Sequence, residues 1–119
     1  MKSKNLDNTN LFYRMQKVIS EIVQRELAKG IRGRYFHSES MTVGFIDIDK
    51  GAILPEHSHF HEQITEVTEG QLEMTIDGIT QVLEPGIITL IPSNIVHGAR
   101  ALTDCKVVDI FNPVREDYK

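Results

Sequence analysis

The chain has 119 residues, which is enough for one ordinary domain and too few for two. Its net charge is −4 and its basic residues are not clustered, which excludes nucleic-acid binding through phosphate neutralisation. A single cysteine, Cys105, excludes an internal disulfide, and its neighbours do not suggest an activated thiol. The sequence has neither a run of about 18 apolar residues nor the apolar segment of a signal peptide, so we expect a cytoplasmic protein with no membrane partner.

The N-terminal segment is predicted to hold a polar tail and one short helix. Residues 1–10 have little to bury, so we expect a frayed tail. Apolar residues then recur at spacings of three and four, which favours an amphipathic helix from about 9 to 20. These residues are Leu11, Met15, Val18, Ile19, Ile22 and Val23. The same period leaves open whether residues 19–27 instead begin a strand.

After Gly30 the pattern is typical of an all-β domain. Apolar residues alternate with others from Met41 to Ile48. Asp77-Gly78 between two short apolar segments predicts a hairpin, because this dipeptide suits the turns that match strand twist. Turn residues recur about every ten positions, which indicates a sandwich or barrel. We therefore divide the chain into a tail and helix over 1–29 and a β-barrel over 30–119.

A metal site is predicted where histidines follow Gly51. His57 and His59 are two positions apart and would project from one face of a strand, so their imidazoles can chelate one ion. The side-chain oxygen of Gln63 can add a ligand from the next strand, and His97, after a strand opened by proline, a fourth. For His61 we expect a position in a loop or at the rim of a pocket instead of a ligand role.

These residues carry a resemblance to the cupin family. The first cupin motif is matched by Gly51, His57, His59 and Gly70, with Gln63 where glutamate is usual. The second motif is matched by Gly86, Pro92 and His97, with Ala101 where asparagine is usual. The resemblance implies a double-stranded β-helix, also called a jelly-roll barrel, which binds a divalent metal.

The glutamine at position 63 has a chemical consequence. Three neutral imidazoles and a neutral amide leave the double positive charge of the ion uncompensated, which favours a strong Lewis acid that attracts anionic oxygens. Such a ligand set suits nickel, iron, zinc, manganese or copper.

A second group of candidate residues lies near the C-terminus. Val107, Asp109 and Phe111 share one strand face, and a carboxylate there is costly unless it is paired, liganded or faces a polar cavity. The alternative is an exposed aspartate on an edge strand. Arg115 is either an ordinary surface arginine or a residue whose planar guanidinium binds a substrate carboxylate in a bidentate manner.

Three segments narrow the resemblance to the KdgF family of small cupins, over about residues 30–118. They are residues 57–65, 91–102 and 108–118. That family converts 4,5-unsaturated monouronates to the linear keto acid. The resemblance implies a metal held by His57, His59, Gln63 and His97, and a catalytic role for Asp109, Phe111 and Arg115 towards a carboxylated sugar.

Two other functions remain open from the sequence. One is a different metal-dependent cupin enzyme, a dioxygenase or an isomerase, because a fold does not determine a function. The other is a non-catalytic cupin that binds a small molecule. Whichever function holds, we expect a homodimer, since small barrels expose edge strands and apolar faces that need cover.

Overall fold

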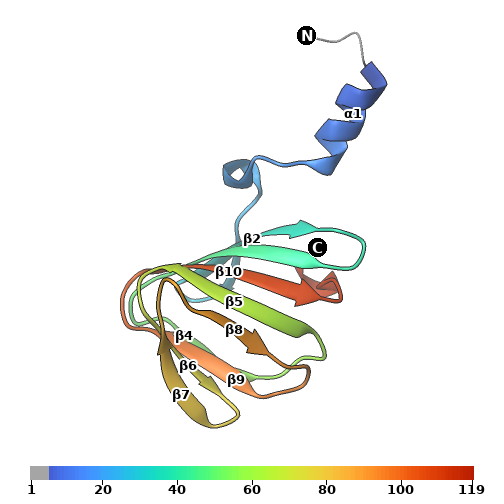
Figure 1. Cartoon of the computed structure of the whole chain (residues 1–119). Coiled ribbons are helices and arrows are strands. Elements are labelled where there is room, and N and C mark those ends of the chain that lie inside the picture. Colours follow the sequence, from blue (N-terminus) through green and yellow to red (C-terminus); the bar gives the residue numbers. More distant parts are fainter. Residues whose placement is uncertain (1–5) are drawn as a thin grey trace.

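The computed structural model describes residues 6–119, which form a β-barrel of two facing antiparallel sheets with an N-terminal arm (Figure 1). The helical elements are α1 (Leu6–Met15) and two 3₁₀ turns, η1 (Ile19–Glu21) and η2 (Glu116–Tyr118). The strands are β1 (Arg25–Ala28), β2 (Ile31–His37), β3 (Thr42–Ile48), β4 (Ile53–His57), β5 (Glu62–Glu69), β6 (Leu72–Ile76), β7 (Ile79–Leu83), β8 (Ile88–Ile91), β9 (His97–Ala101) and β10 (Cys105–Asn112). The all-β prediction is confirmed.

The strand order brings distant segments together. The larger sheet has the order β1-β2-β3-β10-β5-β8, and the smaller has the order β4-β9-β6-β7. The C-terminal strand β10 thus lies between β3 and β5 in the middle of the larger sheet. Asp109 on β10 is therefore not on an edge strand, which removes the edge-strand alternative.

The barrel is apolar at one end and polar at the other. Strand alternation turns every second side chain inward, as in β3 and β10. At one end, Ile48 pairs with Cys105 and Leu72 pairs with Ala101, and all four are buried. Candidate site residues lie towards the other end, where His97 opens β9 and Phe111 is near the end of β10. Packing of the apolar side chains at the first end therefore stabilises the barrel that carries the polar end.

The Asp77-Gly78 hairpin is confirmed between β6 and β7. Both turn residues have positive φ, 50° for Asp77 and 79° for Gly78. This is the backbone that a two-residue hairpin turn requires and that aspartate and glycine tolerate.

The N-terminal arm differs from the prediction. Residues 6–10 are helical and do not belong to a frayed tail, while residues 1–5 lie outside the described part of the chain. The helix ends at Met15 and not near residue 20, because β-branched residues such as Val18 and Ile19 disfavour helix. The sequence left open whether residues 19–27 begin a strand. In the structure Arg25–Ala28 forms β1 and joins the sheet, so the sheet starts before residue 30.

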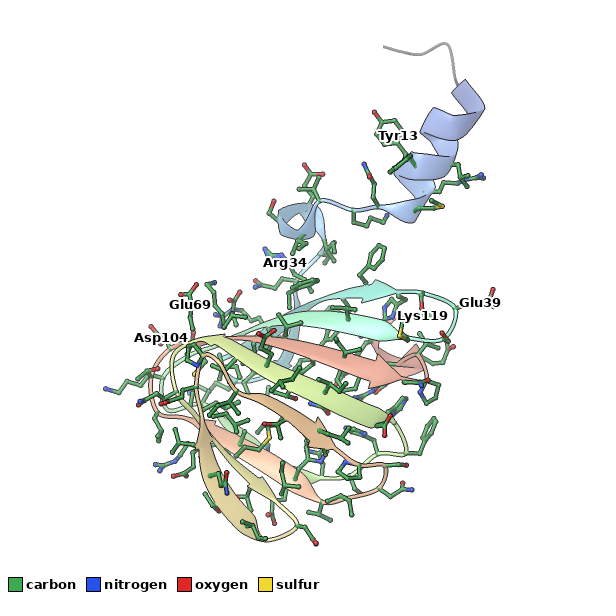
Figure 2. The ribbon with its side chains drawn as sticks, viewed as in Figure 1. Tyr13, Arg34, Glu39, Glu69, Asp104 and Lys119 are labelled. Atoms are coloured by element: carbon green, nitrogen blue, oxygen red, sulfur yellow. The ribbon has the colours of Figure 1, made fainter. Side chains whose placement is uncertain are left out.

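Helix α1 stands away from the barrel (Figures 1 and 2). Its Tyr13 side chain projects into solvent, as does the apolar side chain of Met15. None of the helices in the described residues has the length and apolar character needed to cross a membrane.

Gly70 ends β5 with a φ of +91°, and a Cβ there would overlap the backbone oxygen of Asp104. Gly86 has a similar φ of +98° but open space around it. We expect Gly86→Ala to lower the free energy of unfolding by about 1–2 kcal/mol through backbone strain alone. Gly70→Ala should lose about 1–3 kcal/mol more, through the overlap.

Urea unfolding of the two metal-free variants beside the wild-type protein measures this difference. Equal decreases in the free energy of unfolding for the two variants would show that the backbone at Asp104 moves away from the added Cβ without an energetic penalty.

Candidate metal centre and its pocket

A β-bulge in β4 directs the side chain of His57 into the barrel. The register of β4 against β9 pairs Leu54 with Ala99 and His57 with His97, so β4 holds one residue more than its partner over this span. This bulge lies at Pro55-Glu56 on an edge strand, where proline is tolerated. Because the extra residue reverses the alternation, Leu54 and His57 both line the barrel interior.

Three imidazoles converge at the polar end. His57 and His97 are a cross-strand pair with ring centroids 4.3 Å apart, and the His59 ring lies 5.6 Å and 4.9 Å from them. One nitrogen from each ring lies within 4.8 Å of the others. The three histidines predicted as ligands thus lie close together, although His59 follows β4 in a loop instead of sharing its strand face. Similarly, Pro92 opens a loop and not the strand before His97.

The backbone determines which ring nitrogens face one another. Nδ1 of His57 donates to the oxygen of Pro55 (2.9 Å), and Nδ1 of His97 donates to Ile95 (2.9 Å). Nδ1 of His59 likewise donates to the oxygen of His61 (3.0 Å). With its proton on Nδ1, each neutral ring keeps a lone pair on Nε2. All three rings are thus in the tautomer that binds metals through Nε2.

The Gln63 amide completes the cluster. Its Oε1 lies 3.1 Å from Nε2 of His59, so two lone pairs face each other unless a cation or a proton lies between them. Nε2 of His97 is buried and has no hydrogen-bond partner within the described residues. An orphaned buried nitrogen and facing lone pairs are what a metal cation would satisfy, so these residues fit a divalent ion.

Asp109 lies directly behind Gln63. Its Oδ1 accepts hydrogen bonds from Oγ1 of Thr65 (2.7 Å) and from Nε2 of Gln63 (3.2 Å). Burial raises the pKa of Asp109 to about 6, although both of these hydrogen bonds favour the ionised form. A carboxyl whose pKa lies near neutrality can both take up and release a proton at physiological pH.

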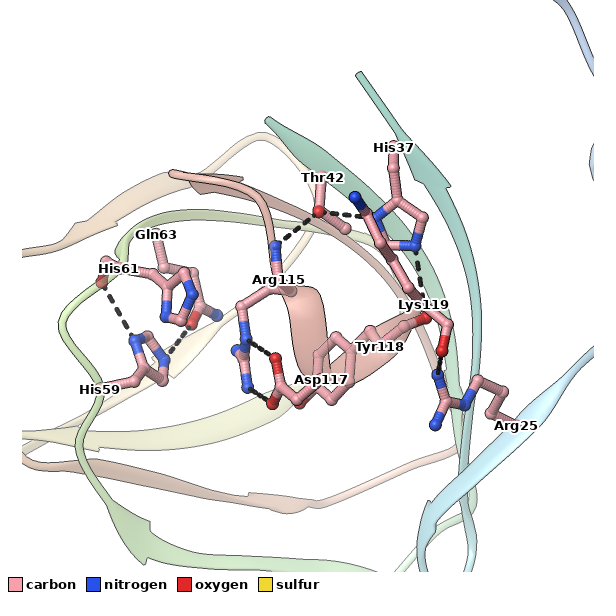
Figure 3. Close-up of polar contacts among 10 residues, drawn as sticks. All are labelled: Arg25, His37, Thr42, His59, His61, Gln63, Arg115, Asp117, Tyr118 and Lys119. Atoms are coloured by element: carbon pink, nitrogen blue, oxygen red, sulfur yellow. Dashed lines mark hydrogen bonds and ion pairs between the residues drawn. The ribbon is translucent and has the colours of Figure 1, made fainter. Parts of the chain in front are cut away.

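Arg115 is held by aromatic rings and a carboxylate, of which Figure 3 shows Tyr118 and Asp117. Its guanidinium carbon lies 4.7 Å from the ring centre of Phe111 and 4.0 Å from that of Tyr118. The Tyr118 ring stacks in turn on Tyr35 at 4.4 Å. Asp117 accepts from Nε (3.1 Å) and Nη2 (2.8 Å) of Arg115. Arg115 is therefore a buried, immobilised cation and not a loose surface side chain.

His61 precedes β5 in the loop, as predicted, and its ring is buried beside Phe60. It does not belong to the group of three converging histidines. Its contribution to that group is its backbone oxygen, which orients His59. The main chain of His61 thus orients His59, while its side chain lies outside the group of three.

The cluster opens into a cavity of about 380 Å³ inside the barrel. This lies in the size range of small-molecule sites. Its polar wall includes Gln63, Thr65, Asp109 and Arg115. Thr65, Tyr35, Asp117 and Tyr118 are lining or supporting residues that sequence reasoning missed, because each acts through a contact with a residue distant in the chain.

Comparison with known proteins agrees with this geometry. The family model described as "Cupin domain" matches residues 44–111. The chain belongs to the cupin family. It is 32% identical over 96 residues to the pectin degradation protein KdgF of Dickeya dadantii, covering 78% of this chain and 87% of that protein.

Solved structures of cupins superpose closely on this one. KdgF from Halomonas sp. has a TM-score of 0.80 at 30% identity, covering 86% of this chain and 96% of that one. An RmlC-like cupin from Shewanella frigidimarina has a TM-score of 0.82 at 28% identity, covering 87% and 94%. The similarity thus extends over nearly the whole of each relative, and the resemblance to KdgF seen in the sequence is confirmed.

His59, His61 and His97 should titrate below the usual imidazole pKa. Desolvation is the largest influence on the pKa values of His59, His61 and His97, and it lowers all three from 6.5. We expect their ring signals to titrate below pH 6.5 in an NMR titration of the metal-free protein with a chelator present.

The lowered pKa values of these imidazoles also determine how the stability of the fold changes with pH. Because the unfolded chain binds protons on these rings more readily, they contribute stability above pH 6.5 that is lost as the pH falls. Asp109 contributes with the opposite sign between about pH 6 and its ordinary 3.8. Ring titration at or above pH 6.5 would contradict the burial of these imidazoles.

Proposed function

We propose that this cupin is a metal-dependent enzyme that converts 4,5-unsaturated monouronates to the linear keto acid. The observation that carries the proposal is the contact between Gln63 and Asp109, which joins a metal-ligand set to a carboxyl with a raised pKa. The similarity to pectin degradation protein KdgF points to uronate breakdown as the chemistry.

The ligands in this proposal are Nε2 of His57, His59 and His97 and the side-chain oxygen of Gln63. All four are neutral, and three Nδ1–H bonds to backbone oxygens orient the imidazoles before an ion arrives. A divalent ion held there supplies a Lewis acid that stabilises negative charge on a sugar oxygen. Nickel, iron, zinc, manganese and copper all suit this set.

Asp109 moves the proton in this proposal. Opening and tautomerising an unsaturated uronate requires transfer of a proton between oxygen and carbon, which a positioned carboxyl can perform. Both hydrogen bonds to Asp109 end on Oδ1, which leaves Oδ2 for the substrate. Asp109 lines the cavity, so a bound sugar can reach it.

Arg115 binds the uronate carboxylate in this proposal. Asp117 occupies its Nε and one donor of Nη2, so three of the five N–H donors remain. The Nη1–Nη2 edge can therefore accept a carboxylate in a bidentate manner while Asp117 stays in place. Phe111 also contacts the guanidinium and forms part of the cavity wall.

Metal binding should distinguish His97 from His61. We expect His97→Ala to weaken Zn²⁺ binding at least about 100-fold, because it removes a ligand with a buried lone pair. His61→Ala keeps the backbone oxygen that orients His59, so its affinity should stay within a few-fold of wild type. Competition with a chromophoric chelator measures both. Equal losses in the two variants would contradict the ligand assignment.

Turnover should depend on the metal and on Asp109. We expect protein loaded with each divalent metal in turn, under anaerobic conditions, to remove the absorbance of a 4,5-unsaturated monouronate with at least one of them. Asp109→Asn keeps an oxygen that accepts from Gln63, so it should retain the metal while the rate falls about 10²- to 10⁴-fold.

Two outcomes of this assay contradict the proposal. The uronate reaction is excluded if the wild-type protein shows no turnover with any metal. The role of Asp109 is excluded if its asparagine variant binds metal and keeps the full rate. A requirement for oxygen would instead favour the dioxygenase alternative.

The homodimer and the cytoplasmic location stay predictions. Apolar side chains are available for a dimer, since the outer face of the larger sheet carries a row that runs across five strands. The row consists of Phe36, Val43, Ile110, Ile64 and Leu90.

A further inference from the structure

We propose that Thr65 is a positioning residue, which orients the amide of Gln63 and the carboxyl of Asp109 with one hydroxyl group. This inference rests on the proposed function, because it concerns a ligand and a proton carrier named there. The hydroxyl is 2.9 Å from Nε2 of Gln63 and 2.7 Å from Oδ1 of Asp109.

Strand geometry puts these three side chains together. Gln63 and Thr65 are two positions apart on β5, so both face the barrel interior. Asp109 is directly opposite Thr65 in the antiparallel pairing of β5 with β10. Thr65 is almost fully buried, at 1% exposed, so water does not compete strongly for its hydroxyl.

The direction of each hydrogen bond follows from the groups involved. An ionised carboxylate only accepts, so the single hydroxyl proton of Thr65 points to Asp109. The hydroxyl oxygen then accepts from the NH₂ group of Gln63, which also donates to Asp109. The three groups form a closed triangle in which every donor meets an acceptor.

This triangle decides which end of the amide faces the imidazoles. A reversed amide would place Oε1 against the Asp109 carboxylate, where no proton separates the two oxygens. The NH₂ group must therefore face Thr65 and Asp109, and Oε1 is left facing Nε2 of His59. Oxygen and not nitrogen is the amide atom that binds a metal.

The same contacts give a physical reason for glutamine at a position where cupins usually carry glutamate. A carboxylate at residue 63 would lie about as far from Asp109 as the NH₂ group now does, at 3.2 Å. Two carboxylates at that distance repel each other unless they share a proton. The amide thus lets a carboxyl remain directly behind the ligand shell.

The experiment compares Thr65→Val, which removes the hydroxyl at nearly constant volume, with Thr65→Ser, which keeps it. Thr89→Val is the matched control, because Thr89 on β8 is the cross-strand neighbour of Thr65 but has no side-chain hydrogen bond to Gln63 or Asp109. For each variant we would measure the dissociation constant of Zn²⁺, turnover of the unsaturated uronate, and urea unfolding without metal.

We expect Thr65→Val to weaken Zn²⁺ binding about 10- to 100-fold, the usual effect of losing a partner of a metal ligand. Its turnover at saturating metal should also fall. Thr65→Ser and Thr89→Val should remain within about threefold of wild type in both measurements. Rescue by serine would separate the hydroxyl from the packing of the methyl group.

The outcomes distinguish this inference from the function beneath it. If wild type binds Zn²⁺ and turns over the uronate while Thr65→Val does both equally well, only the role of Thr65 is overturned. A serine variant as weak as the valine variant would overturn it too, because packing would then be the cause. Failure of the wild-type protein to bind metal would overturn both the proposed function and the inference.

Discussion

The backbone carbonyl oxygens that accept from the three Nδ1–H groups are the constraint on which the site depends. Each lies two residues from its histidine, at Pro55, His61 and Ile95, so local chain geometry supplies the acceptor. A neutral hydrogen bond of this kind contributes only about 1 kcal/mol, but here it also selects one tautomer. Convergence of three Nε2 lone pairs has no benefit for an isolated chain, since lone pairs repel. The arrangement is therefore organised for a cation and not for packing.

The distribution of charge follows from that constraint. The neutral Gln63 takes the position where cupins usually carry glutamate, and the negative charge lies one step further from the imidazoles, on Asp109. The barrel interior raises the pKa of Asp109 by burial, while a divalent ion beyond Gln63 would favour its ionised form. Burial and a bound ion would therefore shift the pKa of Asp109 in opposite directions.

The sequence predicted the ligand group because spacing and strand alternation are local properties. It placed His59 wrongly on a strand, because β4 ends at His57 and the spacing of two histidines does not show where a strand ends. Thr65 gave no signal at all, because threonine is ordinary in a strand and its partner Asp109 is 44 residues away. The end of the N-terminal helix was misjudged because apolar spacing outweighed the low helix propensity of Val18 and Ile19.

The C-terminal turn contributes to the wall of the cavity. The backbone nitrogen of Arg115 donates to Oγ1 of Thr42, which also contacts Nδ1 of His37, so the turn is tied to β2 and β3. Phe111 and Tyr118 both contact the guanidinium, with their ring planes at 76° to each other, and Asp117 takes one edge. The N–H donors of the remaining edge are coplanar. Such an edge favours a planar anion such as a carboxylate, which agrees with the role that the proposed function gives to Arg115.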